Sequence, residues 1–283
     1  MKFLSIQSSV AYGHVGNSAA VFPLQRLGHE VWPVFTVHFS NHTGYGAWRG
    51  PLLAASDVRD VITGIAERGV LDQVDVVLSG YQGGDEIGDV ILEAVAKVKA
   101  ANPKAIYACD PVMGNAKSGC FVHPAIPDLL RDRVVPKADL ITPNQFELGF
   151  LTGTEPRTLT ETLASADLAR AMGPRTILVT SVEQPDAPAE TIEMLAVTDD
   201  GAWLVQTPRL PLKANGSGDL TAALFTARLL SSGDPAQALS ETAASVLGVL
   251  QKTIDSGERE LQIVLGQDAI AHPSAEFVAR KVR

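Results

Sequence analysis

Residues 74–109 read VDVVLSGYQGGDEIGDVILEAVAKVKAANPKAIYAC, and this stretch decides the fold class. Two short apolar runs, Val74–Leu78 and Ala105–Cys109, enclose a periodic helical pattern from Gly84 to Ala101. Short runs rich in Val and Ile that alternate with helices are typical of βαβ units, whose strands are parallel. The stretch therefore predicts an α/β protein built on a mostly parallel sheet.

The same alternation continues on both sides of this unit. The further strands that we expect are Phe3–Gln7, Glu30–Val37, Leu140–Ile141, Thr176–Thr180, Glu193–Thr198 and Gly201–Gln206. The further helices that we expect are Asn17–Leu27, Ser56–Glu67, Ala125–Arg133, Gln145–Leu151, Thr160–Met172, Gly218–Ser231 and Pro235–Ser256, with a tail helix at Ser274–Arg280. The turn Asp199-Asp200-Gly201 is a hairpin signal, which adds an antiparallel edge to the sheet.

Length and composition are those of a globular protein. The chain has 283 residues, of which 46% are hydrophobic and 19% charged, with no internal repeat, low-complexity tract or linker. We therefore expect one domain, residues 1–283. The net charge of −9 argues against sequence-independent nucleic-acid binding, which needs a basic face. An anionic substrate stays open, because a local basic or amide-lined site can lie on an acidic protein.

The sequence shows no sign of export or of membrane insertion. The first residues, MKFLSIQSS, resemble a strand and lack the apolar stretch of a signal peptide. No segment approaches the ~18 apolar residues of a membrane span. The two cysteines, Cys109 and Cys120, make no disulfide framework and are best interpreted as thiols in a reducing compartment. We expect a cytoplasmic protein without membrane contact.

The segment Asn215–Leu224, NGSGDLTAAL, is the most informative one for function. Its glycine-rich turn runs directly into a helix whose first amides have no internal partners and whose dipole favours anions. Small residues let the backbone approach a ligand closely, so the turn predicts an anion pocket that can stabilise charge on a γ-phosphate. Asp219 lies beside these amides, where a carboxylate can take the proton of an attacking hydroxyl.

Asp219 also has a simpler explanation, because acidic residues are common in first helical turns for capping and dipole reasons. The segment is not the nucleotide loop G-x-x-x-x-G-K-[ST], and no G-x-G-x-x-G follows the first strand. Lys213, just before the glycines, is best interpreted as a solvated loop lysine. The loop Phe39–Pro51, which contains Gly44, Gly46 and Gly50, is a candidate flap over the site.

Two more segments lie where a ligand site is expected. Cys109–Gly114, CDPVMG, and Thr142–Leu148, TPNQFEL, follow consecutive predicted strands. Open α/β sheets bind ligands outside the carboxyl ends of their strands. Together with Gly216–Asp219, in this order and separation, the two segments resemble the ribokinase-like superfamily of ATP-dependent kinases. The resemblance implies a three-layer αβα sandwich.

The N-terminal third narrows the resemblance. SIQSSVAYGHVGNSAA at residues 5–20, FSNHTGYG at residues 39–46 and SGY at residues 79–81 look like bacterial pyridoxal kinases. This resemblance extends from Phe3 to about Ala271. It implies ATP-dependent phosphorylation of the 5′-hydroxyl of pyridoxal to pyridoxal 5′-phosphate. It also implies Mg²⁺, in many members K⁺, and a homodimer.

The resemblance implies a role for individual residues. Asp219 matches the catalytic base, and Gly216, Ser217 and Gly218 match the anion hole. Ser8, Thr43, Gly44 and Tyr81, together with Asp219, match the substrate-binding positions. Asp110, Thr142, Asn144, Glu147, Thr180, Ser181, Thr207, Pro208, Arg209 and Leu210 match the ATP-binding positions, with Asp110 and Glu147 near the metal.

Two positions depart from the pattern of the relatives. Asn115 stands where several have Asp, which removes one anionic contact to metal, and Gly44 stands where bacterial relatives carry Gln. Two alternatives stay open, namely a kinase for a related heterocycle such as hydroxymethylpyrimidine and a non-catalytic pyridoxal-binding protein. The missing dinucleotide fingerprint argues against a dehydrogenase. His14 and His42 could line the substrate pocket, given their places in the matched motifs.

Overall fold

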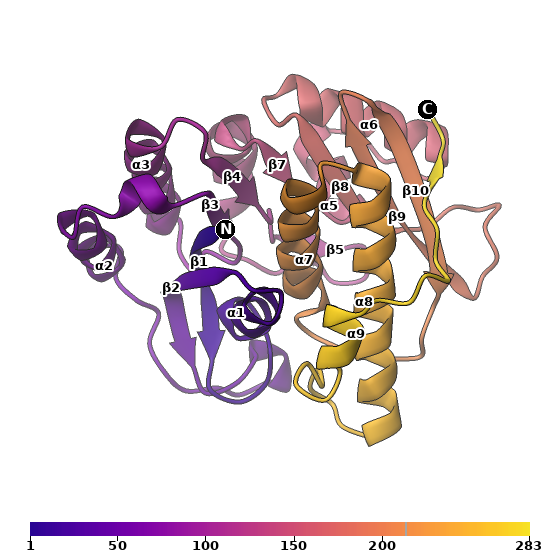
Figure 1. The fold of residues 1–283 in the computed structure, drawn as a ribbon, viewed down its shortest axis with the longest axis horizontal. Coiled ribbons are helices and arrows are strands. Elements are labelled where there is room, and N and C mark those ends of the chain that lie inside the picture. The colour runs from indigo at the N-terminus through magenta and orange to yellow at the C-terminus, as the bar shows by residue number, and fades with distance from the viewer. Residues whose placement is uncertain (213) are drawn as a thin grey trace.

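The computed structural model describes residues 1–212 and 214–283, so Lys213 lies outside the described residues. A large central sheet has the strand order β11-β10-β9-β8-β7-β4-β3-β1-β2 (Figure 1). Its strands are β1 (Lys2–Val10), β2 (Glu30–Phe39), β3 (Val76–Ser79), β4 (Ile106–Cys109), β7 (Leu140–Ile141), β8 (Thr176–Val182), β9 (Thr191–Thr198), β10 (Gly201–Pro208) and β11 (Arg280–Lys281). From β2 to β8 all neighbours are parallel, whereas β9, β10 and β11 continue the sheet with antiparallel pairs. The predicted sheet is confirmed.

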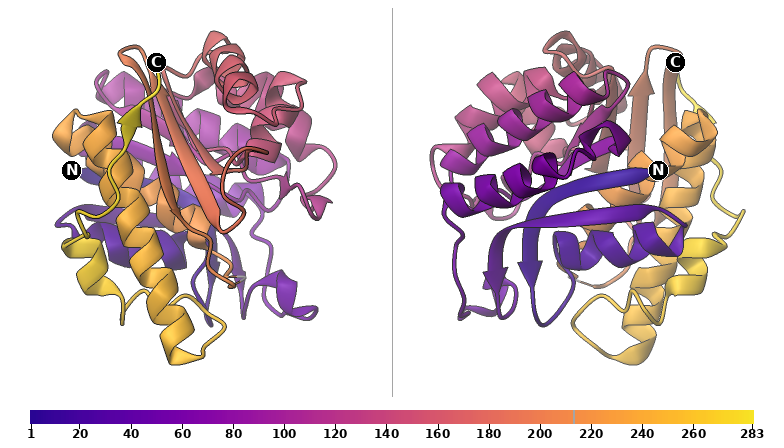
Figure 2. Two further views of the ribbon diagram at one scale, coloured as in Figure 1. Left: turned by 90° about the vertical axis from the view of Figure 1, so that its right-hand side faces the viewer. Right: turned by 60° about the vertical axis from the view of Figure 1, so that its left-hand side comes forward.

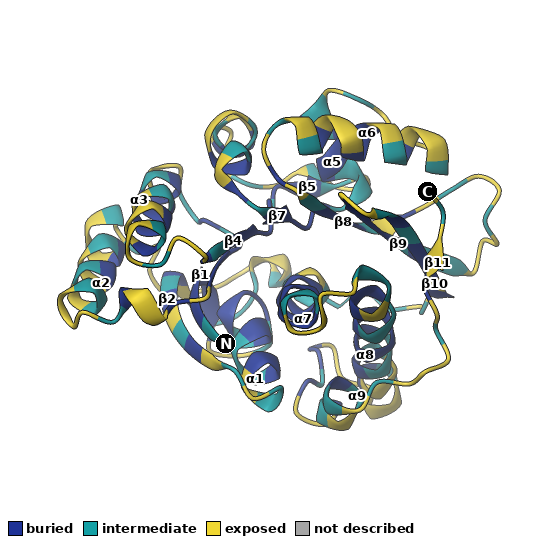
Figure 3. Ribbon diagram, turned by 45° about the horizontal axis from the view of Figure 1, so that its top comes forward, coloured by how far each residue is buried: buried dark blue, intermediate teal, exposed yellow. Residues whose placement is uncertain are grey.

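Helices cover both faces of the sheet and make three layers (Figure 3). One face carries α2 (Ala55–Glu67), α3 (Glu86–Ala101), α5 (Gln145–Thr152) and α6 (Leu159–Ala171). The other face carries α1 (Asn17–Arg26), α7 (Ser217–Ser232), α8 (Pro235–Ser256) and α9 (Gln267–Ala271). A small hairpin of β5 (Gly114–Asn115) and β6 (Gly119–Cys120) precedes the short helix α4 (Ile126–Leu129). The arrangement is the αβα sandwich that the resemblance implies.

The strands are buried on both faces because each face packs against helices. In β1, Leu4 and Ile6 pack in the core cluster of α2 and α3, while Phe3 packs in the cluster of α1 and α7. Successive side chains of a strand point to opposite faces, so a strand covered on both sides needs an uninterrupted apolar run.

Within the described part of the chain, every helix is too short or too polar to span a lipid bilayer.

The predicted tail helix at Ser274–Arg280 is wrong. The chain there has a turn at Ala275 and Glu276 and ends in β11, which pairs with β10 along the outer edge of the sheet (Figure 2). Phe277 and Ala279 pack with the α7 and α8 side of the core, and the Ala279 N–H donates to Ser240 Oγ at 2.8 Å. The open edge of β10 supplies backbone partners to an extended tail, and these outweigh the local helical pattern.

Only the first half of the predicted helix Ala125–Arg133 is an α-helix. The α-helix α4 ends at Leu129, and a π-helical turn follows at Leu130–Val134. A 3₁₀ turn at Val135–Lys137, which contains Pro136, then leads towards β7. Apolar residues of both turns, Leu130, Val134 and Val135, are buried in the core, so the apolar pattern is real although the backbone departs from a regular helix.

Candidate active site

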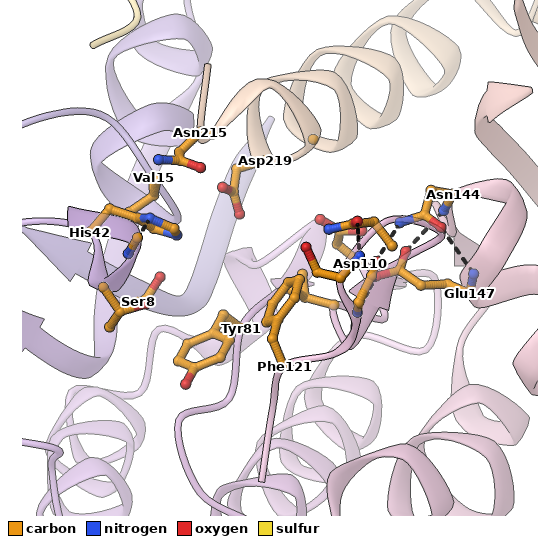
Figure 4. A pocket seen from close by; sticks show the side chains of 18 of the residues that line it. Ser8, Val15, His42, Tyr81, Asp110, Phe121, Asn144, Glu147, Asn215 and Asp219 are labelled. Atoms are coloured by element: carbon orange, nitrogen blue, oxygen red, sulfur yellow. Dashed lines mark hydrogen bonds between the residues drawn. The ribbon is translucent and has the colours of Figure 1, made fainter. Parts of the chain in front are cut away.

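A cavity of about 570 Å³ lies at the carboxyl ends of the parallel strands. Its walls come from β1, from the loops after β3, β4 and β7, and from the N-terminus of α7 (Figure 4). The predicted site residues that line it are Ser8, Thr43, Gly44, Tyr81, Asp110, Thr142, Asn144, Glu147, Thr180, Gly216, Gly218 and Asp219. The fold therefore brings together side chains from the first, middle and last thirds of the chain.

The glycine turn fixes the place of Asp219. Gly216 forms the N-cap of α7 with φ 87°, and a Cβ there would come within 1.8 Å of the His14 carbonyl oxygen. Only glycine allows so close a contact in this left-handed conformation. The turn is thereby packed against the loop after β1, and Asp219 follows in the first turn of the helix, facing the cavity (Figure 4).

The surroundings of Asp219 suit a proton acceptor near neutral pH. Burial raises the pKa of its carboxyl to about 6, although the backbone N–H groups of Gly16 and of Asp219 itself partly offset this rise. Above that pH the carboxylate is charged and can accept a proton, and a pKa near the working pH is what a general base needs. The amides at the start of α7 favour an anion beside it.

Asp110 lies across the cavity from Asp219, after the end of β4 (Figure 4). It is buried, and its Oδ1 accepts a hydrogen bond from Thr142 Oγ1 at 2.9 Å. Burial raises the pKa of Asp110 well above its usual range, and the charges of Glu147 and Asp219 raise it further. The three carboxylates oppose one another's ionisation, so a nearby cation would stabilise their charged forms.

Glu147 fastens the loops of the site to each other. Its Oε2 accepts the Asn144 N–H at 2.9 Å, and Asn144 Oδ1 accepts the Glu147 N–H at 2.9 Å, which makes a capping box at the start of α5. Glu147 Oε1 accepts the N–H groups of Met113 and Gly114 at 2.9 and 3.2 Å. Asn144 Nδ2 also donates to the Gly114 carbonyl at 2.8 Å. Both side chains therefore hold the loop after β4 in place.

The donor set fits a Mg²⁺ ion that keeps most of its waters. Among the described residues no group of three His, Cys, Asp or Glu side chains could hold a metal ion. Asp110 and Glu147 nevertheless bring carboxylate oxygens to the cavity, and none of its described lining residues is Lys or Arg. Mg²⁺ is usually bound by one or two carboxylates, waters and substrate phosphates, and such an ion would balance these carboxylates.

A second cavity of about 560 Å³ adjoins the first, because Thr180 and Gly218 line both. The predicted residues that line only the second cavity are Ser181, Thr207, Pro208, Arg209, Leu210 and Ser217. Other walls are apolar side chains of β9 and α8, namely Ile192, Met194, Val246, Leu247 and Leu250. An apolar slot that opens on an anion-binding turn suits a nucleotide, with its base in the slot and its phosphates towards the turn.

Ser181 has an unusual backbone in this second cavity. It is the one non-glycine residue with a positive φ, 51°, in residues 1–212 and 214–283. The register between β8 and β9 shifts between Val179 and Val182, which indicates a bulge there. Bulges and residues held in sparsely populated conformations are frequent beside active sites, where they redirect side chains.

The predicted flap lines the first cavity through His42, Thr43 and Gly44. The Gly44 N–H donates to His42 Nδ1 at 3.0 Å, and a Cβ at Gly44 would come within 2.8 Å of the same nitrogen. Glycine at this position therefore lets the His42 ring fold over the backbone towards the cavity. His14, by contrast, is not among the described residues that line the cavity.

Sequence reasoning missed the contribution of the β5–β6 hairpin. Asn115, Ser118 and Phe121 line the first cavity, and Phe121 lies next to Tyr81 (Figure 4). Strands of two residues leave almost no periodic signal. The available signal was an aromatic residue, Phe121, close to a Gly-containing loop, and in the structure this residue is 54% exposed.

Comparisons with known proteins agree with this geometry. Residues 60–263 match the family model described as phosphomethylpyrimidine kinase. Pyridoxal kinase PdxY of Leifsonia xyli subsp. xyli is 70% identical, with 100% of both chains covered, and that of Corynebacterium diphtheriae is 59% identical at the same coverage. The structure of pyridoxal kinase from Leishmania donovani in complex with ADP and pyridoxamine has a TM-score of 0.93 and 27% identity, covering 100% of this chain and 99% of that one. The matches to these relatives span the whole chain, and the chain belongs to the pyridoxal kinase family.

Proposed function

We propose that this kinase transfers the γ-phosphoryl group of ATP to the 5′-hydroxyl of pyridoxal, with Asp219 as the general base. The observation that carries the proposal is the place of Asp219, which faces the first cavity and follows Gly218, one of the two described residues that line both cavities. The relatives named pyridoxal kinase support the acceptor, and the ADP of the Leishmania complex supports ATP as the donor.

The first cavity suits an aromatic ring that carries a hydroxymethyl group. Tyr81 and Phe121 offer aromatic surface, and Ser8 offers a hydroxyl (Figure 4). The flap residue Thr43 also lines this cavity and offers a second hydroxyl. A ring held among these residues can direct its hydroxymethyl group towards Asp219. Such positioning supplies much of the rate enhancement of phosphoryl transfer.

The transfer needs one proton acceptor and several fixed dipoles. Asp219 accepts the proton of the hydroxyl as its oxygen bonds to the γ-phosphorus. The bond from that phosphorus to the bridging oxygen breaks, and the electron pair leaves with ADP. The amides of Gly216 to Gly218 stabilise charge on the transferred group. The flap excludes water, which would otherwise compete as acceptor.

Asp110 and Glu147 are the proposed Mg²⁺ residues, with Glu147 acting through water. When bound, Mg²⁺ would neutralise charge on the phosphate oxygens. The oxygens of Thr142, Thr180 and Ser181 are proposed to face the phosphates or a K⁺ ion, and Asn144 to lie on the phosphate side. The cavity positions of Thr142 and Thr180 support this assignment.

We further propose a single-domain, cytoplasmic homodimer. The pairing of strands from both ends of the chain in one sheet supports a single domain. Two free thiols, one of them on an exposed residue, support a reducing compartment. The homodimer follows from the family resemblance, and sedimentation equilibrium would test it, since a monomer would contradict it.

One other acceptor has a specific observation behind it. The matching family model is described as phosphomethylpyrimidine kinase, which favours a substituted pyrimidine as the second candidate, and hydroxymethylpyrimidine is the form that carries a hydroxyl for Asp219 to deprotonate. Both acceptors are flat heterocycles with a hydroxymethyl group, so the same Asp219 chemistry serves either.

The deciding experiment is an assay with ATP and Mg²⁺ in which pyridoxal 5′-phosphate is followed by absorbance. We expect turnover with pyridoxal that falls by a factor on the order of 10² to 10⁴ in Asp219→Ala and persists in the control Asp200→Ala, an exposed hairpin residue. If the protein phosphorylated hydroxymethylpyrimidine but not pyridoxal, hydroxymethylpyrimidine would replace pyridoxal as the proposed acceptor. ATP binding without turnover of either compound would instead indicate a non-catalytic binding protein.

A further inference from the structure

Glu260, in the loop between α8 and α9, bridges two segments that border the active site. Its side chain is buried, with 6% of the residue exposed. Glu260 Oε1 accepts the Tyr45 hydroxyl at 2.6 Å, and Oε2 accepts the His14 N–H at 3.2 Å. Gly13 makes room for it, because a Cβ there would lie 2.0 Å from Oε2. One carboxylate therefore joins the flap to the loop after β1.

Arg259 holds the same flap residue from another direction. Its guanidinium carbon lies 3.7 Å from the centroid of the Tyr45 ring, and its Nη2 donates to the Gly44 carbonyl at 3.2 Å. Stacking of a guanidinium on an aromatic face is attractive even at an exposed site. Tyr45 is thus held at its ring by Arg259 and at its hydroxyl by Glu260, next to Gly44, which lines the cavity.

We call Arg259 and Glu260 together the clasp. The loop that carries the clasp is anchored to the helices of the catalytic site. The next residue, Leu261, is fully buried and packs in one cluster with Leu220 and Leu224 of α7 and Ala19 of α1. These helices begin at the glycine turn and at the loop after β1. The clasp is therefore fixed to the rigid part of the site and reaches out to the flap.

The contacts of the clasp continue to the proposed base. Glu260 holds the His14 N–H, and the carbonyl of the same His14 packs against Gly216. Two residues after His14, the Gly16 N–H donates to the Asp219 carboxylate and lowers its pKa. A loss of the Glu260 contact would loosen the loop against which the glycine turn rests.

We propose that Arg259 and Glu260 are positioning residues, which hold the flap over the substrate cavity and hold the His14–Gly16 loop against the glycine turn. The inference rests on the proposed kinase function and extends it to residues that no motif contains. Neither residue is among the described residues that line the cavity, so both act through Tyr45, Gly44 and His14. A flap held in this way retains the acceptor and excludes water.

The first test does not depend on catalysis. Amide hydrogen exchange of residues 39–51, measured by mass spectrometry without ligands, reports opening of the flap. Tyr45→Phe removes only the hydroxyl bond to Glu260 and leaves the ring under Arg259. We expect exchange in the flap to rise roughly threefold to tenfold in Tyr45→Phe and in Glu260→Ala. The matched control Glu258→Ala, an exposed residue of the same loop, should exchange like the wild type.

The second test separates the acceptor from the nucleotide. In Tyr45→Phe we expect the KM for pyridoxal to rise roughly threefold to tenfold, with kcat and the KM for ATP changed by less than about twofold. Glu260→Ala should raise the same KM and also lower kcat, because the loop beside Asp219 loosens. ATP hydrolysis without acceptor should increase in both. In the double variant, Tyr45→Phe should add little, since the bond is already lost.

Two outcomes would overturn the inference. Unchanged flap exchange together with an unchanged KM for pyridoxal in Tyr45→Phe would do so, even if Glu260→Ala proved too unstable to study. An equal effect in Glu258→Ala would also do so, because it would indicate a general loosening of the loop. If the wild type turned over no pyridoxal, the proposed function would fail, while hydrogen exchange would still decide the role of the clasp.

Discussion

Asp219 differs from an ordinary acidic residue at the start of a helix. The N-cap of α7 is Gly216, which has no side chain, and Asp219 is the acidic residue of the first turn. Its carboxyl is partly buried and faces a cavity that two further carboxyls, those of Asp110 and Glu147, also line, and desolvation raises its pKa to about 6. A residue kept for stability alone would not be expected in so costly a place. The capping explanation is therefore the weaker one, and three predictions concern this residue.

Replacing Asp219 by Ala should lower kcat by a factor on the order of 10² to 10⁴, since the hydroxyl then attacks without a positioned proton acceptor. The KM values for both substrates should change little. Asp219→Asn should behave similarly, because it keeps the shape of the side chain but not its basicity. Steady-state kinetics of the purified variants decides this, and a rate near that of the wild type would rule out Asp219 as the base.

The activity should decrease as the pH falls through about 6, because the Asp219 carboxylate becomes protonated there. A plot of log kcat/KM against pH should approach a slope of one on the acid side. The residual activity of Asp219→Asn should lack this acid limb. An acid limb that persists unchanged in the variant would assign it to a group of the substrates or to another residue.

The same group should cost stability at neutral pH. Its pKa rises from 3.8 in the unfolded chain to about 6 in the folded one, so stability is lost as the pH rises through this window. Without bound ligands, Asp219→Asn should therefore be more stable than the wild type by up to about 3 kcal/mol above pH 7. The difference should vanish below about pH 4. Urea denaturation at both pH values measures it, and a variant that is less stable at neutral pH would contradict the sign.

At the scale of elements, the two glycines before and within the first turn of α7 have different reasons to be glycine. A Cβ at Gly216 would meet the His14 carbonyl at 1.8 Å, whereas a Cβ at Gly218 would meet nothing within 4 Å. Gly216 is thus required by packing and by its φ of 87°, while Gly218 is free of both demands. Gly218 lines both cavities, so the open space beside it is available to the phosphates in the proposed mechanism.

The two positions should respond differently to the same substitution. Gly216→Ala should lower the free energy of unfolding by about 1 to 3 kcal/mol and remove most activity, because the turn must shift away from His14. Gly218→Ala should keep the melting temperature of the wild type but lower kcat, because the methyl group enters the phosphate space. Thermal denaturation alongside kinetics measures both. Equal melting temperatures for the two variants would refute the distinction.

Sequence patterns could predict those parts of the site that follow directly from single elements. Asp110 and Thr142 follow buried strands, and Asp219 lies in the first turn of a helix. The predicted strand ends and helix start were therefore sufficient to predict that all three lie at the same edge of the sheet. Contacts between distant loops left no such pattern, since the Tyr45 to Glu260 hydrogen bond joins positions 215 residues apart. The β5–β6 hairpin was missed because two-residue strands have no measurable period.

At the scale of the whole molecule, the tail shows why local pattern was insufficient. The predicted helix is replaced by β11 because the edge strand β10, which is distant in the sequence, offers unpaired backbone groups to the tail. The last residue adds to this contact, since the Arg283 carbonyl accepts the Ala202 N–H at 3.0 Å and its guanidinium binds Asp167 at 2.6 and 2.8 Å. The tail therefore closes the antiparallel edge of the sheet.

Removal of residues 280–283 should lower the free energy of unfolding by about 1 to 3 kcal/mol, because several edge hydrogen bonds and the contact with Asp167 are lost. The KM values should not change, since no residue of this segment lines either cavity. Arg283→Ala is the matched control, because it removes the ion pair but keeps the backbone pairing. Its cost should stay below about 1 kcal/mol, as exposed ion pairs contribute little. Denaturant titration measures both, and an altered KM would place the tail in the active site.

The position of β1 inside the sheet has a consequence for synthesis of the protein. β1 lies between β2 and β3, so residues 2–79 already contain a complete set of three neighbouring parallel strands. A nascent chain on the ribosome can therefore begin its sheet early. Asp219 and Glu260 are added to the chain only in the last third of its synthesis. Chains released before that point are scaffolds that have neither the base nor the clasp, and prematurely terminated products cannot consume ATP by this chemistry.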